Sequence, residues 1–188
     1  MNLQVEVMDD FNGDKSFSDR LIPEIQNVLG KVFFRVAPIE EDMKRNTDLI
    51  VFHSGNFRIS ARVRRYNYFL KYPNDFTVRS TRKSGAKTEI DKIMYGWGDY
   101  FFYGFADKDN KHLHAYGIGS LKVFRRVFWD FFREHRKFLG KEEYVEKNSC
   151  YFRAFKWELF PKEILIASHN LEINFKDSMD INKDRLCK

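Results

Sequence analysis

The sequence of 188 residues has only two cysteines, Cys150 and Cys187, and no CxxC pair. Two cysteines cannot build a disulfide framework, and without CxxC pairs we expect no zinc site of the finger type. No run of eighteen apolar residues occurs, and the start MNLQVEVMDD has neither a basic segment nor an apolar stretch. We therefore expect no membrane span, no signal peptide and a cytoplasmic location.

The motifs of two common enzyme classes are also missing. The pattern GxxxxGK[ST] does not occur, so a P-loop nucleotide site is not expected. The histidines His112, His114 and His135 lack the HExxH spacing of zinc proteases. They are more simply interpreted as core or surface histidines.

Aromatic and basic side chains are abundant instead. Aromatic residues make up 17% of the chain, including 20 Phe, so bulky rings must fill much of the interior. The formal net charge is +6 and the sequence pI is about 9.2. A basic balance favours association with polyanions such as nucleic acid, although it does not bear on the fold.

The order of patterned segments predicts an α/β fold, with α+β as the alternative, in which helices flank one central mixed sheet. We expect a single domain over residues 1–173 and a loose polar tail over 174–188. The predicted helices cover 16–30, 88–95 and 121–140. The predicted strands and extended pieces cover 31–38, 47–52, 57–65, 75–80, 99–107, 112–120, 151–159 and 163–168.

Local signals set the expected ends of these elements. Ser16 or Ser18 is the candidate cap of the first helix and Gly30 its stop, and Pro23 is tolerable there only near the first turn. The turn HSGN between strands 47–52 and 57–65 predicts a hairpin.

The stretch KTEIDKIMYGWGDYFFYGF, residues 87–105, is the densest of the chain. Thr88 with Asp91 three residues later resembles a capping box and predicts a helix start. We expect Ile90, Ile93, Met94 and Trp97 to form the packing face of this helix, and the aromatic strand that follows to belong to the core.

Two acidic residues stand in unusual places. Glu24 shares a helical face with Leu21, Ile25 and Val28, where burial of a carboxylate is costly unless it is paired. Alternatively it lies at the edge of the apolar stripe and reaches solvent. Asp48 precedes an apolar strand, a position suited to a Mg²⁺ ligand or, more simply, to capping a turn.

Basic residues gather in two segments. In FRISARVRR the alternation places Arg58, Ser60, Arg62 and Arg64 on one face, and Arg65 follows. Arginine presents a planar fork suited to phosphate, but these cations could equally pair with Glu24, Asp48 or Glu89. The second segment forms a basic loop that leads into a helix N-terminus, a suitable anion site. Its members are Arg79, Arg82, Lys83 and Lys87.

The order of Glu24 on a helix, Asp48 on a strand and a further strand resembles the PD-(D/E)XK nuclease fold. More closely, RNTDLIVF, RISARVRR and DFTVRSTRKSGAKTEIDKIMYGWGDYFFYGFAD resemble a family of uncharacterised phage and prophage proteins. The resemblance covers roughly residues 16–170. It implies a protein of the host cytoplasm when phage-encoded.

The nuclease resemblance implies roles for particular residues. Glu24 would be the acid of the first helix and Asp48 the metal ligand of the strand. The adjoining strand should carry an acid, one spacer and a lysine, but this sequence has Ser60, Ala61 and Arg62 there. Glu89, followed by Lys92, is the candidate replacement for the missing acid. Arg62 could stabilise a phosphorane but could not act as a general base.

Three hypotheses follow. In the first, Glu24, Asp48 and Glu89 hold Mg²⁺ or Mn²⁺ for phosphodiester hydrolysis, while Arg62, Lys92 and Arg64 neutralise the transition state. In the second, a nuclease-like fold without catalysis binds nucleic acid or inhibits a host protein. In the third, the charges only form ion pairs within a protein-binding or structural module.

Overall fold

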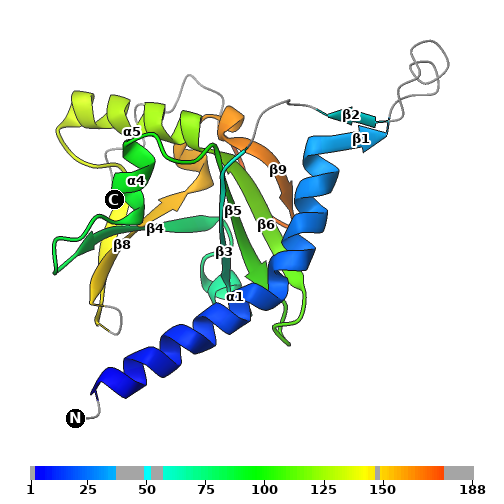
Figure 1. The fold of residues 1–188 in the computed structure, drawn as a ribbon. Helices are drawn as coiled ribbons and strands as arrows, with labels where there is room; N and C mark the ends of the chain where they lie inside the picture. The colour runs from blue at the N-terminus through cyan, green and yellow to red at the C-terminus, as the bar shows by residue number, and fades with distance from the viewer. Residues whose placement is uncertain (1–2, 37–48, 52–56, 147–148, 176–188) are drawn as a thin grey trace.

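Two β-sheets that share an aromatic core, and a long N-terminal helix against one of them, organise the chain (Figure 1). The computed structural model describes residues 3–36, 49–51, 57–146 and 149–175. The helices are α1 (Leu3–Phe33), α3 (Tyr66–Lys71), α4 (Glu89–Met94) and α5 (Leu121–His135), with 3-10 turns η2 (Trp157–Leu159) and η3 (Lys162–Ile164). The strands are β1 (Phe34–Val36), β2 (Leu49–Val51), β3 (Ile59–Arg64), β4 (Asp75–Arg82), β5 (Tyr100–Ala106), β6 (Leu113–Ser120), β7 (Lys141–Val145), β8 (Cys150–Lys156) and β9 (Leu165–His169).

The larger sheet is mixed and has the strand order β3-β5-β6-β9. Strand β3 runs parallel to β5, whereas β6 is antiparallel to both β5 and β9. The second sheet, β4-β8-β7, is antiparallel, and β1 pairs with β2 in a separate ribbon. Strands β3 and β4 therefore each lie at an edge of their own sheet.

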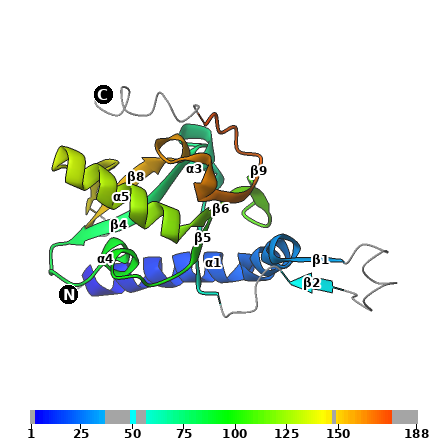
Figure 2. The same ribbon diagram turned by 90° about the horizontal axis from the view of Figure 1, so that it is seen from above.

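Helix α1 covers one face of the larger sheet because its apolar residues recur at helical spacing. Phe17, Leu21 and Ile25 are buried against Val63 and Phe102. Figure 2 shows α1 on one side of this sheet, with α5, β4 and β8 on the other.

The larger core lies on the side of the sheet away from α1. Phe101, Tyr103 and Phe105 of β5 point into it and meet side chains of β4, β8 and α5. Because Phe102 and Ala106 of the same strand face α1, both faces of β5 are covered. This explains why its sequence, YFFYGFA, lacks the polar alternation of a half-exposed strand.

Much of the predicted order is confirmed, including the mixed sheet with helices. Strands 75–80, 99–107 and 112–120 correspond to β4, β5 and β6, and helix 121–140 corresponds to α5, which ends earlier, at His135. Helix α4 begins with the predicted capping box, in which Thr88 and Asp91 satisfy each other's backbone groups.

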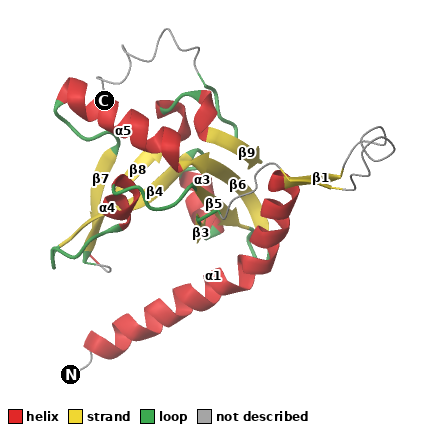
Figure 3. Ribbon diagram, turned by 45° about the horizontal axis from the view of Figure 1, so that its top comes forward, coloured by secondary structure: helices red, strands yellow, loops and turns green. Residues whose placement is uncertain are grey.

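The first helix was predicted too short. Its helical conformation continues through Ser16 and Ser18 and past Gly30, and Pro23 lies inside it. Proline removes one backbone hydrogen bond, but Leu21 and Ile25 on either side pack against the sheet and compensate. The helix in Figure 3 accordingly extends past the sheets at its N-terminal end.

Two further predictions were wrong, and two elements were missed. The hairpin of 47–52 with 57–65 does not form, because β2 pairs with β1 and β3 pairs with β5. The strands divide between two main sheets instead of one. Helix α3 and strand β7 were not predicted, because neither has a buried residue to give a periodic pattern.

Trp97 does not belong to the packing face of α4. Ile90 and Ile93 are buried as expected and Met94 packs against the core, but Trp97 is exposed. The helix ends at Met94, so its periodicity does not reach Trp97. Within the described residues, no helix combines the length and apolar character that a membrane span requires.

Candidate functional site

Three arginines converge between the edge strands of the two sheets. Val63 of β3 points toward α1, so the neighbouring Arg62 and Arg64 point to the opposite side. There they meet Arg79 of β4. The guanidinium carbons of Arg62, Arg64 and Arg79 lie 5.5, 5.6 and 5.5 Å from the ring centre of Phe152 on β8. We call these three residues the arginine cluster.

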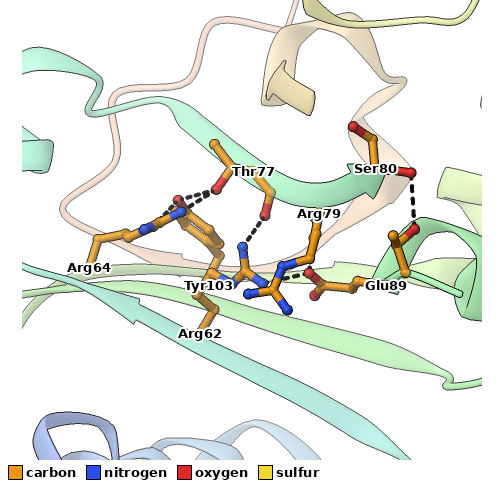
Figure 4. Close-up of polar contacts among 8 residues, drawn as sticks. Arg62, Arg64, Thr77, Arg79, Ser80, Glu89 and Tyr103 are labelled. Atoms are coloured by element: carbon orange, nitrogen blue, oxygen red, sulfur yellow. Dashed lines mark hydrogen bonds and ion pairs between the residues drawn. The ribbon is translucent and has the colours of Figure 1, made fainter. Parts of the chain in front are cut away.

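One carboxylate, that of Glu89, enters the arginine cluster. Arg62 Nη2 donates to Glu89 Oε2 at 2.5 Å, and the backbone N–H of Arg79 donates to the same oxygen at 3.2 Å (Figure 4). The position of Glu89 is fixed by the start of α4, where Thr88 Oγ1 donates to the Ser80 carbonyl at 3.0 Å. The capping box therefore places this carboxylate beside β4.

Polar groups of β4 and β5 orient the other arginine side chains. Arg64 Nη2 donates to Thr77 Oγ1 at 2.9 Å, and its Nε donates to the Tyr103 hydroxyl at 3.3 Å. Arg62 Nη1 donates to the Thr77 carbonyl at 3.2 Å. The arginine forks are therefore held by neutral acceptors as well as by Glu89, which leaves their charges largely uncompensated.

The electrostatics of the cluster favour an added anion. Burial lowers the pKa of the Arg62 guanidinium, the Glu89 carboxylate raises it, and the charges of Arg64 and Arg79 lower it again. Arginine remains protonated near neutral pH in spite of such shifts. The Nε of Arg79 is buried and has no hydrogen-bond acceptor among the described residues. The cluster thus carries more positive charge and donor capacity than its surroundings use.

The cluster borders a recess between the sheets. Arg62, Glu89 and Ser60 lie at its polar side, and Phe76 and Phe101 form part of its apolar lining. The side chains of Arg62 and Glu89 are 24% and 30% exposed, so solvent and solutes reach the ion pair. The arrangement can accept the oxygen atoms of an anion from the solvent side.

Glu24 lies on the other side of the larger sheet. Its Oε2 accepts the backbone N–H of Leu113 at 3.0 Å and lies 3.8 Å from His112 Nδ1. It therefore caps the connection between β5 and β6 from α1. Glu24 faces the α1 side of the sheet, whereas Glu89 faces β4.

The predicted metal ligands are not gathered in one place by the described residues. Glu24 and Glu89 each bind different protein groups, and Asp48 lies outside the described residues. Across 3–36, 49–51, 57–146 and 149–175, no group of three His, Cys, Asp or Glu residues is close enough to hold a metal ion.

The remaining predicted basic residues are exposed. Several lie over aromatic rings: Arg58 over Trp97 at 5.5 Å, Lys83 over Tyr144 at 4.6 Å, and Lys87 over Tyr95 at 4.7 Å. A hydrogen bond to Tyr144 raises the pKa of the Lys83 ammonium. Three others are exposed at separate points, Arg65 over Phe17 of α1, Arg82 at the end of β4 and Lys92 in the last turn of α4.

Three residues of the site were not predicted. Phe152, the common platform of the arginines, reaches them through the pairing of β4 with β8, whose register places Arg79 opposite Phe152. Thr77 and Tyr103 came from strands that were predicted, but their hydroxyl groups were assigned no role. The alternation over residues 75–79 places Thr77 and Arg79 on one face, so the sequence alone could have indicated that these two side chains lie together.

No protein-family model, no curated protein and no solved structure matches this chain.

Proposed function

We propose that this protein binds nucleic acid through the phosphate backbone, with the arginine cluster as the centre of the contact surface. The observation that carries the proposal is the convergence of three guanidinium groups on the Phe152 ring, with one carboxylate paired to the guanidinium of Arg62. Like charges held together at partial burial repel, and a phosphate oxygen would relieve that repulsion.

Two further features support phosphate as the anion. Arginine forks match phosphate oxygens in pairs, and the buried Nε of Arg79 offers a donor without an acceptor among the described residues. The exposed basic residues Arg58, Arg82, Lys83 and Lys87 extend the positive surface beyond the cluster. Several exposed cations in addition to the cluster suit a polymer of phosphates better than a single small anion.

The relation to PD-(D/E)XK nucleases remains a hypothesis from the sequence resemblance, to which the mixed sheet flanked by α1 adds support. Metal-dependent hydrolysis by Glu24, Asp48 and Glu89 likewise stays a prediction, since Asp48 lies outside the described residues. Binding requires neither, because the arginine cluster forms without Glu24 or Asp48.

The proposal predicts salt-dependent binding that weakens when the cluster loses charge. With three phosphate contacts, the logarithm of the association constant for duplex DNA should fall with the logarithm of salt concentration at a slope of about −2 to −3. Arg64→Gln or Arg79→Gln should weaken binding of all sequences alike and reduce the magnitude of that slope by about one. Fluorescence anisotropy of labelled oligonucleotides at several salt concentrations measures both quantities.

Arg133→Gln is the matched control, because it removes the same charge from the exposed surface of α5, where Arg133 pairs with Asp130. It should leave the affinity and the salt slope close to those of the wild type. Equal losses in Arg64→Gln, Arg79→Gln and Arg133→Gln would mean that only net charge matters, and the proposed site would be wrong. Absence of any polyanion binding would leave the cluster an internal ion-pair network.

A further inference from the structure

Two large aromatic side chains stand exposed in one turn at the end of α4. Tyr95 is 72% exposed and Trp97 is 63% exposed, although they are separated only by Gly96. In the same segment, the side chains of Ile90 and Ile93 are buried in the core. The core thus buries the aliphatic side chains of Ile90 and Ile93, whereas the rings of Tyr95 and Trp97 remain in solvent.

The backbone of the turn is held by several hydrogen bonds. The N–H of Gly96 donates to the Ile93 carbonyl at 2.9 Å, and that of Trp97 donates to the Lys92 carbonyl at 3.1 Å. This pair is the Schellman pattern of helix termination, and Gly96 supplies the required left-handed conformation with φ of 93°. The exposed rings are therefore presented from a fixed backbone.

A second element reinforces the turn from outside α4. Arg125 Nη1 of α5 donates to the carbonyls of Ile93 and Gly98, at 3.4 and 3.2 Å. Gly98 also approaches α5 so closely that an added Cβ would lie 2.8 Å from Leu121 Cδ1. The turn is thus pinned to the core on both sides of Trp97.

The exposure of Trp97 is not what this type of helix end normally gives. In a Schellman motif the residue at the position of Trp97 commonly packs against an apolar residue in the last turn. Here the corresponding helix positions are Asp91 and Lys92, which offer no apolar surface. The indole therefore contributes little to ending the helix, and a role outside the fold explains it better.

Cations accompany both rings. Lys87 Nζ lies over Tyr95, and the guanidinium of Arg58 lies over Trp97. Arg58 precedes β3 and has the same strand parity as Arg62 and Arg64, so it continues the row of the arginine cluster toward the turn. Aromatic faces beside a row of phosphate-binding cations are the combination found in surfaces that bind single-stranded nucleic acid.

We propose that Tyr95 and Trp97 stack on unpaired bases, so that the protein prefers single-stranded over double-stranded nucleic acid. This inference rests on the proposed phosphate contacts of the arginine cluster and adds the class of nucleic acid. In a duplex the base faces are covered by their neighbours, whereas in a single strand they are available to the two rings. The preorganised turn lowers the entropic cost of presenting them.

The test compares a labelled oligothymidylate with a duplex of equal length, using the full chain. Trp97→Leu should weaken binding of the single strand by about tenfold, the loss of one stacked base, and leave duplex binding unchanged. Trp97→Phe keeps a ring at the same place and should retain most of the affinity. Tyr95→Leu should act in the same direction as Trp97→Leu.

Trp129→Leu is the matched control, because Trp129 is also an exposed tryptophan but lies on α5 against Phe132. It should change neither affinity. If Trp97→Leu weakens single-strand and duplex binding equally, or neither, the stacking inference is wrong while the phosphate proposal stands. If wild-type protein binds neither probe, the phosphate proposal itself fails.

Discussion

Replacing Phe76 with alanine should lower the free energy of unfolding by about 4 kcal/mol, the usual cost of removing a large ring from a packed core. Phe76 is 1% exposed and lies on β4, where its ring contacts Phe101 of β5, Phe155 of β8 and Trp157 of η2. It is therefore a point at which both sheets meet. Urea unfolding followed by circular dichroism measures the change.

The control for Phe76→Ala is Phe138→Ala, since Phe138 is 51% exposed and contacts Phe128, Phe132 and the Arg153 guanidinium near the surface. Its substitution should cost about 1 kcal/mol or less. Comparable losses at both positions would contradict the view that one shared core joins the sheets. Because Thr77 and Arg79 follow Phe76 on β4, loss of its ring should also loosen the arginine cluster.

Local signals in the sequence predicted α4 and the buried face of α5, but not the ends of α1. The capping box of Thr88 and Asp91 set the start of α4, and the apolar spacing of Leu121, Phe124 and Phe128 set the face of α5. Such patterns report on the conformation of a few neighbouring residues, which the neighbours themselves largely determine. The prediction for Trp97 failed because the periodicity was extended past the point where glycine ends the helix.

Strand pairing was the part that sequence could not supply. The turn HSGN made a hairpin of 47–52 with 57–65 the simplest expectation, yet β3 pairs with β5, about forty residues further along. Partner choice depends on which faces are buried in the completed fold, and α1 and the second sheet bury β5 on both sides. The same reason hid Phe152, which joins the site only through the β4–β8 pairing.

For the candidate site, the sequence predicted the residue types but left their partners open. Arg62 and Arg64 were expected on one strand face, paired with phosphate or with a carboxylate. The structure places Arg62 against Glu89 and holds Arg64 by Thr77 and Tyr103. Pairing with a carboxylate is therefore seen at Arg62, whereas contact with phosphate stays a proposal. Glu24, an expected partner, instead accepts a backbone N–H on the other side of the sheet.

Glu89→Gln separates the role of counter-ion from that of metal ligand. As the counter-ion of a partly buried cluster, Glu89 stabilises the fold, and its neutral replacement should lower the free energy of unfolding by about 2 kcal/mol. The same change removes a negative charge that repels phosphate. The variant should therefore bind oligonucleotides about fivefold more tightly at low salt, which corresponds to a repulsion of about 1 kcal/mol.

Glu89→Gln is informative because it should lower the stability of the fold and raise the affinity for oligonucleotides. Glu134→Gln, on the exposed side of α5, changes the net charge equally and should alter neither quantity appreciably. If Glu89 were a ligand for Mg²⁺ or Mn²⁺, its substitution should instead weaken metal-dependent binding and abolish any metal-dependent cleavage. Tighter binding without metal, together with a less stable fold, would assign Glu89 to the arginine cluster as its counter-ion.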